Sequence, residues 1–224
     1  MEKELRNSHI IPEFLYKPLY DEKHRAIPFS NITGSKEYQR RKPLQKGLRE
    51  KLLCHDCEQL LNDRYEKYFK KRWFDEKALP ETMASGKSFS INTLDFHKFK
   101  LFHLSILFRA SVSSLHEFQQ VALGSHEESL RKIIFNDVPT SDREYVVLCH
   151  AITKSNSEIQ YGLITSPFKL RQPNGYISYG FCFGGCVWYY IVDSREISEF
   201  SSFMLKSTGE ISVAQIPWED FLNL

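Results

Sequence analysis

Hydrophobic positions recur at helical spacing in three stretches of the chain. In residues 57–74, apolar and aromatic side chains return every three or four positions with charged residues between them, which predicts an amphipathic helix ended by Pro80. The first half of residues 96–123 is apolar nearly all round, which predicts a buried helix. Residues 125–135 open with Ser125 and two glutamates, which predicts a further helix with a serine cap and an acidic first turn.

After Pro139 the pattern changes from helical spacing to that of strands. Short segments rich in β-branched and aromatic residues are separated by polar or glycine-containing turns. The predicted strands are 144–153, 159–165, 176–183, 186–192 and 211–213, and residues 217–222 predict a short closing helix. The many aromatic residues of these strands indicate core and cross-strand packing, with a recognition face as the alternative.

The order of these elements predicts an α+β fold. Residues 1–80 form an N-terminal module with few long apolar runs, and residues 93–224 form a domain in which helices precede an antiparallel β-meander. The intervening residues 81–92 are mostly small and polar and contain a glycine, which is typical of a linker. Because the N-terminal module is small, we expect a staple such as a bound metal ion to stabilise it.

Composition limits the class of protein. Of the 224 residues 26% are charged and 42% are apolar, as in an ordinary folded domain. No apolar run approaches the roughly 20 residues that span a bilayer, and the N-terminus lacks an apolar signal core. We therefore expect a cytoplasmic protein with no membrane partner. In that compartment the five cysteines favour metal binding or burial over disulfides.

Positive charge is concentrated in the N-terminal third. Residues 1–75 contain 17 Lys and Arg against 12 Asp and Glu, whereas residues 76–224 contain 13 against 16. This distribution favours an anionic ligand, and a solvated charged surface is the alternative. The candidate nucleic-acid-binding residues are Arg40, Arg41 and Lys42, which would contact phosphates regardless of sequence. Residues 70–72 would extend this patch.

Two short motifs carry the candidate chemistry. The first is Ser8-His9-Ile10-Ile11-Pro12, and the second is Leu53-Cys54-His55-Asp56-Cys57-Glu58, which opens a predicted helix. In this order and with these neighbours the motifs resemble the HNH family of nucleases, over about residues 5–75. The resemblance implies the ββα-metal fold, in which a two-stranded hairpin and a helix hold one catalytic metal ion.

By this resemblance the chain is a metal-dependent HNH-type endonuclease that hydrolyses phosphodiester bonds. His9 would be the general base, because a neutral imidazole has a pKa near the working pH; an ordinary turn histidine is the alternative. Mg²⁺ or Mn²⁺ would neutralise charge on the scissile phosphate. Glu58 stands where the family has Asn, and Asn62 lies one turn later on the same helix face, so both join His9 as expected catalytic residues.

The expected ligands of the catalytic metal depart from the family pattern. Ser8 stands where the family commonly has a metal-binding Asp or His, and a hydroxyl is a poor ligand for a hard cation. Glu58 could supply the missing carboxylate. The alternative role for Glu58 is to complement the N-terminus of its helix electrostatically.

A structural zinc ion is the second expected metal. Cys54 and Cys57 have zinc-ligand spacing, but a tetrahedral site needs four ligands, and the family's second cysteine pair is absent upstream of the histidine motif. Cys182 and Cys186 could complete the site, or they could flank a tight turn between strands as buried thiols. Packing could also replace the zinc staple. His55, inside the motif, is either a ligand or an exposed residue.

Two further features favour structural roles. Arg109 lies in an otherwise apolar helical segment, where a buried guanidinium must be paired, and Glu127 or Glu128 could provide the partner. Cys149 and His150 are adjacent in a predicted strand, so their side chains should lie on opposite faces and cannot form a nucleophilic pair.

Two functions follow from the resemblance. The first is an active nuclease, with DNA favoured over RNA as its nucleic-acid partner; bacterial proteins of this type often serve in defence against phage. The second is a degenerate HNH-like module that no longer cuts and acts as a binding or assembly subunit with a protein partner. His9 and the basic segment favour the first function, whereas Ser8, Glu58 and the missing cysteines favour the second.

Overall fold

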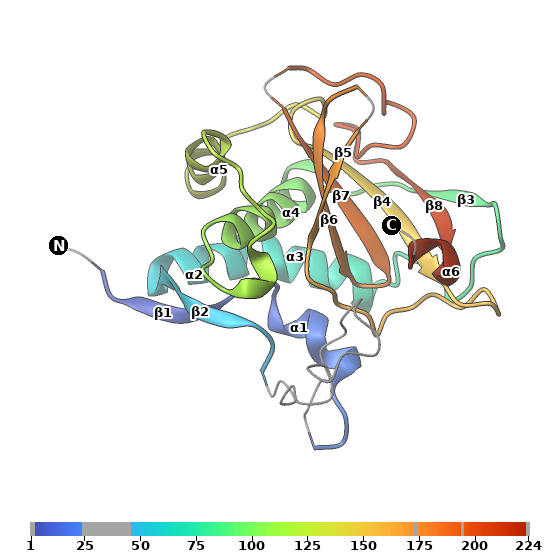
Figure 1. Ribbon diagram of the computed structural model, residues 1–224, viewed down its shortest axis with the longest axis horizontal. Coiled ribbons are helices and arrows are strands. Elements are labelled where there is room, and N and C mark those ends of the chain that lie inside the picture. The colour runs from blue at the N-terminus through green and yellow to red at the C-terminus, as the bar shows by residue number, and fades with distance from the viewer. Residues whose placement is uncertain (1–2, 24–45, 173, 194, 223–224) are drawn as a thin grey trace.

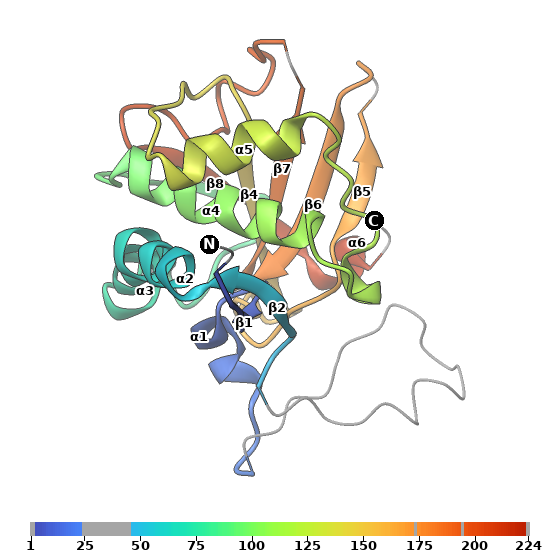
Figure 2. The same cartoon turned by 90° about the vertical axis from the view of Figure 1, so that its left-hand side faces the viewer.

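The computed structural model describes residues 3–23, 46–172, 174–193 and 195–222. It is a mixed α and β structure in which a six-stranded sheet is covered on one side by helices, with a separate two-stranded hairpin beside them (Figures 1 and 2). No helix within these residues is long and apolar enough to cross a membrane.

The large sheet is mostly antiparallel, which agrees with the predicted fold class. Its strands are, in spatial order, β3 (Ser88–Ile91), β8 (Ile211–Pro217), β4 (Val146–Thr153), β7 (Cys186–Val192), β6 (Ile177–Phe183) and β5 (Phe168–Arg171). Among the paired strands of the described residues, β4 and β8 alone run parallel. The expected purely antiparallel meander is therefore corrected at this one pair.

Two predicted elements differ from the structure. Residues 159–165 form no strand; Ile159 makes an isolated bridge with Thr153, and the backbone then turns as the N–H of Tyr161 approaches the carbonyl of Ile159. Residues 81–92, predicted as a linker, include β3, whose buried Ile91 and half-buried Phe89 pair with β8 at the sheet edge.

The helices lie close to the positions that the residue spacing predicts, except that one helix ends earlier than expected. They are α1 (Glu13–Tyr16), η1 (Lys17–Leu19), α2 (His55–Leu61), η3 (Asn62–Glu66), α3 (Lys67–Lys70), η4 (Lys71–Asp75), α4 (Phe96–Ser111), η5 (His116–Phe118), α5 (His126–Phe135) and α6 (Trp218–Phe221). The helix predicted over residues 96–123 ends near Ser111. Beyond it, the Ser113 hydroxyl and the Ser114 backbone N–H donate to the carboxylate of Glu50, at 2.8 and 3.0 Å, and these bonds draw the chain away from the helix axis.

The run from α2 to η4 is one continuous helix with two π-helical segments, η3 and η4. Its buried residues are Leu61, Tyr65, Phe69 and Trp73, each four positions after the last. In a regular α-helix a four-residue repeat drifts by about 40° per step. The wider turns of η3 and η4 offset this drift, so the buried stripe keeps facing the same neighbours.

The two faces of the sheet pack against different partners. Val147, Cys149 and Ala151 of β4 face the helices and share one core with the hairpin and the α2–η4 run. Val146 and Leu148 face a second cluster, which includes Phe221 of α6. This alternation places Cys149 and His150 on opposite faces, as predicted. The buried aromatic residues of β6 and β7 lie within these cores, so packing accounts for them.

A fully buried histidine occupies the centre of the main core. His103 of α4 packs against Trp188 with ring centroids 4.1 Å apart, and its Nδ1 lies 3.0 Å from the hydroxyl of Tyr190. Burial raises the pKa of Tyr190, so that hydroxyl stays protonated and is able to donate to Nδ1 or to accept from it. The other ring nitrogen, Nε2, has no partner among the described residues.

We expect this histidine to make the fold acid-sensitive. Burial lowers the pKa of His103 well below its ordinary value of 6.5, so below that pH the unfolded chain takes up a proton that the folded chain cannot. The free energy of unfolding should fall by about 1.4 kcal/mol per pH unit per buried histidine below pH 6.5. Urea unfolding at pH 7.5, 6 and 5 should show a smaller loss in His103→Phe than in the wild type. The exposed His116→Gln is the control, and an unchanged pH dependence in His103→Phe would contradict this assignment.

Candidate functional site

The first motif ends one strand of a hairpin, and the second motif joins the other strand to a helix. β1 (Leu5–His9) pairs antiparallel with β2 (Arg49–Cys54), with His9 opposite Arg49 and Leu5 opposite Cys54. The helix that follows β2 therefore begins near the far end of β1 and runs back toward His9. This path brings Glu58 and residues further along the helix beside the histidine.

These elements enclose a cleft with a volume of about 590 Å³. Its lining combines titratable, cationic and amide side chains from the hairpin, α1, η1, the α2–α3 run and α4. The lining residues are His9, Pro12, Glu13, Phe14, Lys17, His55, Glu58, Gln59, Asn62, Glu66, Lys67, Lys70 and Arg109.

His9 is held as a neutral base. Its Nε2 lies 2.8 Å from the carbonyl oxygen of Lys46. A carbonyl only accepts, so Nε2 carries the hydrogen and the lone pair of the neutral ring is on Nδ1. Burial lowers the pKa of His9, and the hydrogen bond to Lys46 opposes this only in part. The imidazole is therefore unprotonated at neutral pH and can accept a proton.

Arg109 fixes the position of His9 from below. Its Nη1 donates to the carbonyl oxygen of His9 and to the carboxylate of Glu66, both at 2.9 Å. Its Nε also donates to the carbonyl of Ser105 in its own helix. The Arg109 side chain is 4% exposed and that of Glu66 14% exposed, so solvent screens this ion pair little. The predicted partners Glu127 and Glu128 are wrong: they interact with Ser111 and Arg131, respectively.

The two helix carboxylates that line the cleft, Glu58 and Glu66, differ in availability. Glu66 is neutralised by Arg109, whereas no described residue forms an ion pair or hydrogen bond with the side chain of Glu58. Asn62 lies between them on the same stripe. A ligand in the cleft would therefore meet the base His9, two carboxylates that no described residue pairs, Glu13 and Glu58, and the amides of Gln59 and Asn62.

Cationic side chains surround the same cleft. Lys17 comes from η1, Lys67 and Lys70 from α3, and all three are exposed. Lys67 pairs with Asp63 at 2.7 Å, and no described residue pairs with Lys17 or Lys70. Since exposed ion pairs are weak, these lysines can exchange partners for an anionic ligand.

The structure brings together only some of the residues predicted from sequence. His9, Glu58 and Asn62 line one cleft, together with His55, whose side chain is exposed. Cys54 and Cys57 lie at the start of α2 and do not line it. The predicted nucleic-acid-binding residues Arg40, Arg41 and Lys42 lie outside the described residues.

The candidate metal-binding side chains do not form a closed metal site. Within the described residues, no group of three or more His, Cys, Asp or Glu side chains is arranged to hold an ion. Cys54 and Cys57 are half-buried free thiols; the backbone N–H of Cys57 lowers the pKa of Cys54, and burial raises that of Cys57 to about 11. The remaining cysteines belong to the large sheet. Two of them, Cys182 and Cys186, flank a two-glycine turn and are buried, so they do not complete a zinc site here.

Sequence reasoning missed Glu66 and the role of Arg109. A usable signal was present: Glu58, Asn62, Glu66 and Lys70 follow one another at four-residue intervals and all line the cleft. The partner of Arg109 carried no local signal, because Glu66 precedes it by 43 residues.

Comparison with known proteins adds no relative: no protein-family model, curated protein or solved structure matches the chain. The candidate site is therefore defined by its own geometry.

We expect the Arg109–Glu66 pair to be important for stability. Removing one partner of a buried ion pair leaves an uncompensated charge, so Glu66→Gln and Arg109→Met should each lower the free energy of unfolding by about 3 kcal/mol or more. The double variant should lose less than the sum of the two, because they share one interaction. Urea unfolding measures all three. Arg131→Met, which breaks an exposed pair with Glu128, should have no measurable effect, and equal losses in all the variants would contradict the assigned role.

Proposed function

We propose that this chain is a nucleic-acid hydrolase of the HNH type whose active site is the cleft described above. One observation carries the proposal: the histidine of the first motif and the Glu58 and Asn62 side chains of the second line one cleft with three lysines. The connection of a hairpin to a helix is the arrangement that the ββα-metal fold would require.

The residues of the cleft would have different roles in phosphodiester hydrolysis. The Nδ1 of His9 would accept the proton of the attacking water, since Nε2 is engaged by Lys46. Lys17, Lys67 and Lys70 would bind the phosphates on either side of the reacting bond. Arg109 would keep His9 in place from beneath the cleft.

Glu58 and Asn62 are better suited to bind a divalent ion that keeps several water ligands than one that is coordinated entirely by protein groups. Mg²⁺ usually keeps several waters and is bound by one or two carboxylates together with substrate phosphates. When bound with substrate, Mg²⁺ or Mn²⁺ would supply charge neutralisation at the phosphate. Glu58, which no described residue neutralises, would provide the carboxylate, and Asn62 would provide a carbonyl oxygen or orient a water molecule.

A non-cutting binding subunit is the second candidate function. It is favoured by Ser8, which occupies the position of the family's metal-binding Asp or His. Ser8 is 1% exposed, its hydroxyl donates to the carbonyl of Arg6, and it does not line the cleft. A module of this kind would bind nucleic acid through the same lysines without hydrolysing it. A place in phage defence remains a proposal that rests on the family resemblance alone.

His9→Ala should abolish nuclease activity. Loss of a general base costs about 10²- to 10⁴-fold in rate. The assay compares cleavage of plasmid DNA, single-stranded DNA and RNA by the wild type and the variant, with Mg²⁺ or Mn²⁺ and with EDTA. The exposed His116→Ala serves as the control and should cut like the wild type. If the purified wild type binds these nucleic acids and cuts none of them, the binding subunit replaces the hydrolase.

Two adjacent lysines offer a matched test of phosphate binding. Lys70 lines the cleft, whereas Lys71 lies outside it and pairs with Glu76. Lys70→Gln should weaken DNA binding and reduce the slope of log affinity against log salt by about 1, because one phosphate contact is lost. Fluorescence anisotropy at several salt concentrations, with EDTA present, measures both effects. Lys71→Gln should behave like the wild type, and equal effects of the two substitutions would place the phosphates elsewhere.

A further inference from the structure

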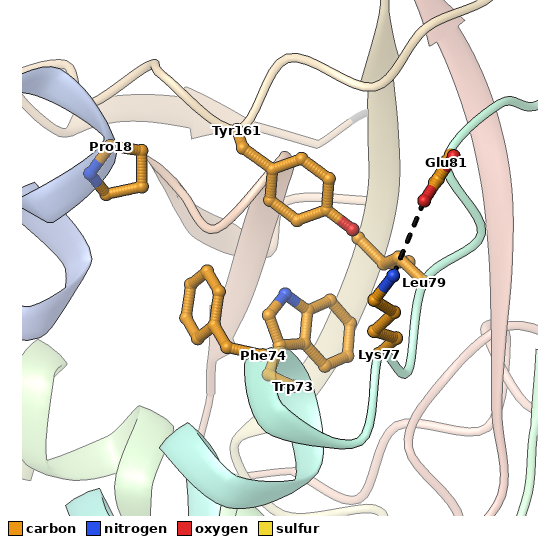
Figure 3. Close-up of a pocket in the computed structure, with 7 residues that line it drawn as sticks. All are labelled: Pro18, Trp73, Phe74, Lys77, Leu79, Glu81 and Tyr161. Atoms are coloured by element: carbon orange, nitrogen blue, oxygen red, sulfur yellow. Dashed lines mark hydrogen bonds and ion pairs between the residues drawn. The ribbon is translucent and has the colours of Figure 1, made fainter.

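A second hollow with aromatic walls lies beside the cleft. It has a volume of about 250 Å³ and is lined by Pro18, Trp73, Phe74, Lys77, Leu79, Glu81 and Tyr161. Pockets for drug-sized ligands start at about 300 Å³, so this one is suited to a single planar ring system. Figure 3 shows the ring of Tyr161 on one side of the pocket and those of Trp73 and Phe74 on the other.

The aromatic walls are held rigidly. The indole N–H of Trp73 donates to the carbonyl oxygen of Gly184 at 2.7 Å, and the ring is fully buried behind the pocket surface. Gly184 has a φ of +62°, and a Cβ there would approach the Trp73 ring nitrogen to 3.0 Å, so the turn permits this close contact. Phe74 and Tyr161 are half-buried, with ring centroids 6.3 Å apart, and both line the pocket.

Polar groups gather at one end of this apolar pocket. Lys77 and Glu81 form an ion pair at 3.4 Å with side chains 76% and 88% exposed, so solvent screens the pair and either group can bind a ligand. Burial raises the pKa of Tyr161 to about 12, which keeps its hydroxyl protonated. No described residue accepts a hydrogen bond from that hydroxyl. The pocket thus combines ring faces with donors and an acceptor at its edge, as the recognition of a heteroaromatic ring requires.

Residues that line the cleft adjoin residues that line the pocket. Lys17 lines the cleft, and the next residue, Pro18, lines the pocket. The ring of Phe14, in the cleft, meets the ring of Phe74, in the pocket, edge to face at 6.0 Å. A nucleic-acid strand with a phosphate among the lysines of the cleft therefore has a ring-sized, apolar site within reach of one of its bases.

We infer that the pocket receives an unpaired nucleobase of the strand whose backbone lies in the cleft, which makes single-stranded or locally opened nucleic acid the substrate class. The inference rests on the proposed function for the position of the backbone. A paired base cannot reach a pocket of this kind without leaving its stack.

The test is binding without cleavage. A single-stranded oligonucleotide with one 2-aminopurine is titrated with the wild type in EDTA, alongside the same strand with an abasic site at that position and free 2-aminopurine nucleoside. We expect quenching of the 2-aminopurine fluorescence and binding that is about 5- to 100-fold tighter than that of the abasic strand, the range of one stacked base. Equal affinities for the two strands, or quenching of the free nucleoside alone, would overturn the inference.

Substitutions locate the stacked base. Tyr161→Ala should reduce affinity for the intact strand to that for the abasic strand, whereas Tyr161→Phe should retain most of it. Phe203→Ala removes an aromatic ring that is 51% exposed and outside the pocket, and it should leave binding unchanged. Thermal unfolding checks each variant, and the abasic comparison needs only the wild type. If the protein cuts intact and abasic strands equally, the proposed nuclease function stands and the base-pocket inference is wrong. If it binds the strands as expected and never cuts them, the base-pocket inference stands and the nuclease function is wrong.

Discussion

One buried guanidinium holds the candidate site together. Arg109 of α4 donates to the backbone of His9, to the carboxylate of Glu66 and to its own helix, so three segments distant in sequence meet at one charge. Moving the hairpin or the α2–η4 run away from α4 would leave that charge buried and uncompensated. The aromatic core around Phe69 and His103 joins the same segments, so the N-terminal module packs against α4 over both polar and apolar contacts.

The same helix serves the core and the cleft because both of its stripes repeat every four residues. Leu61, Tyr65, Phe69 and Trp73 form the inner stripe, and Glu58, Asn62, Glu66 and Lys70 form the outer one. A regular α-helix would rotate each stripe by about 40° per step and turn the last residues away from the first. The π-helical segments η3 and η4 prevent this rotation. The geometry of the candidate site and the packing of the core therefore depend on the same departure from a regular helix.

The sequence predicted local features better than long-range ones. Spacing located the helices at 57–74 and 125–135 and four of the five predicted strands, because those patterns depend on neighbouring residues. It overextended α4, whose end is set by Glu50 from another strand, and could not show that β8 returns parallel to β4. In the site, motifs identified His9, Glu58 and Asn62, but Glu66 and Arg109 find each other only through the fold.

The cleft and the pocket differ chemically from each other, as the charged backbone of a nucleic-acid strand differs from its bases. Lysines and carboxylates line the cleft, and aromatic rings line the pocket; Phe14 of the cleft contacts Phe74 of the pocket, and Lys17 and Pro18 are adjacent in the chain. Cutting and binding would use this surface equally. What distinguishes cutting from binding is the supply of carboxylates: Ser8 is buried and Glu66 is neutralised, which leaves Glu58 and Glu13 to meet an ion carried in with the substrate. Hydrolysis in this cleft would therefore depend on the two carboxylates that no described residue pairs, Glu58 and Glu13, to bind that ion.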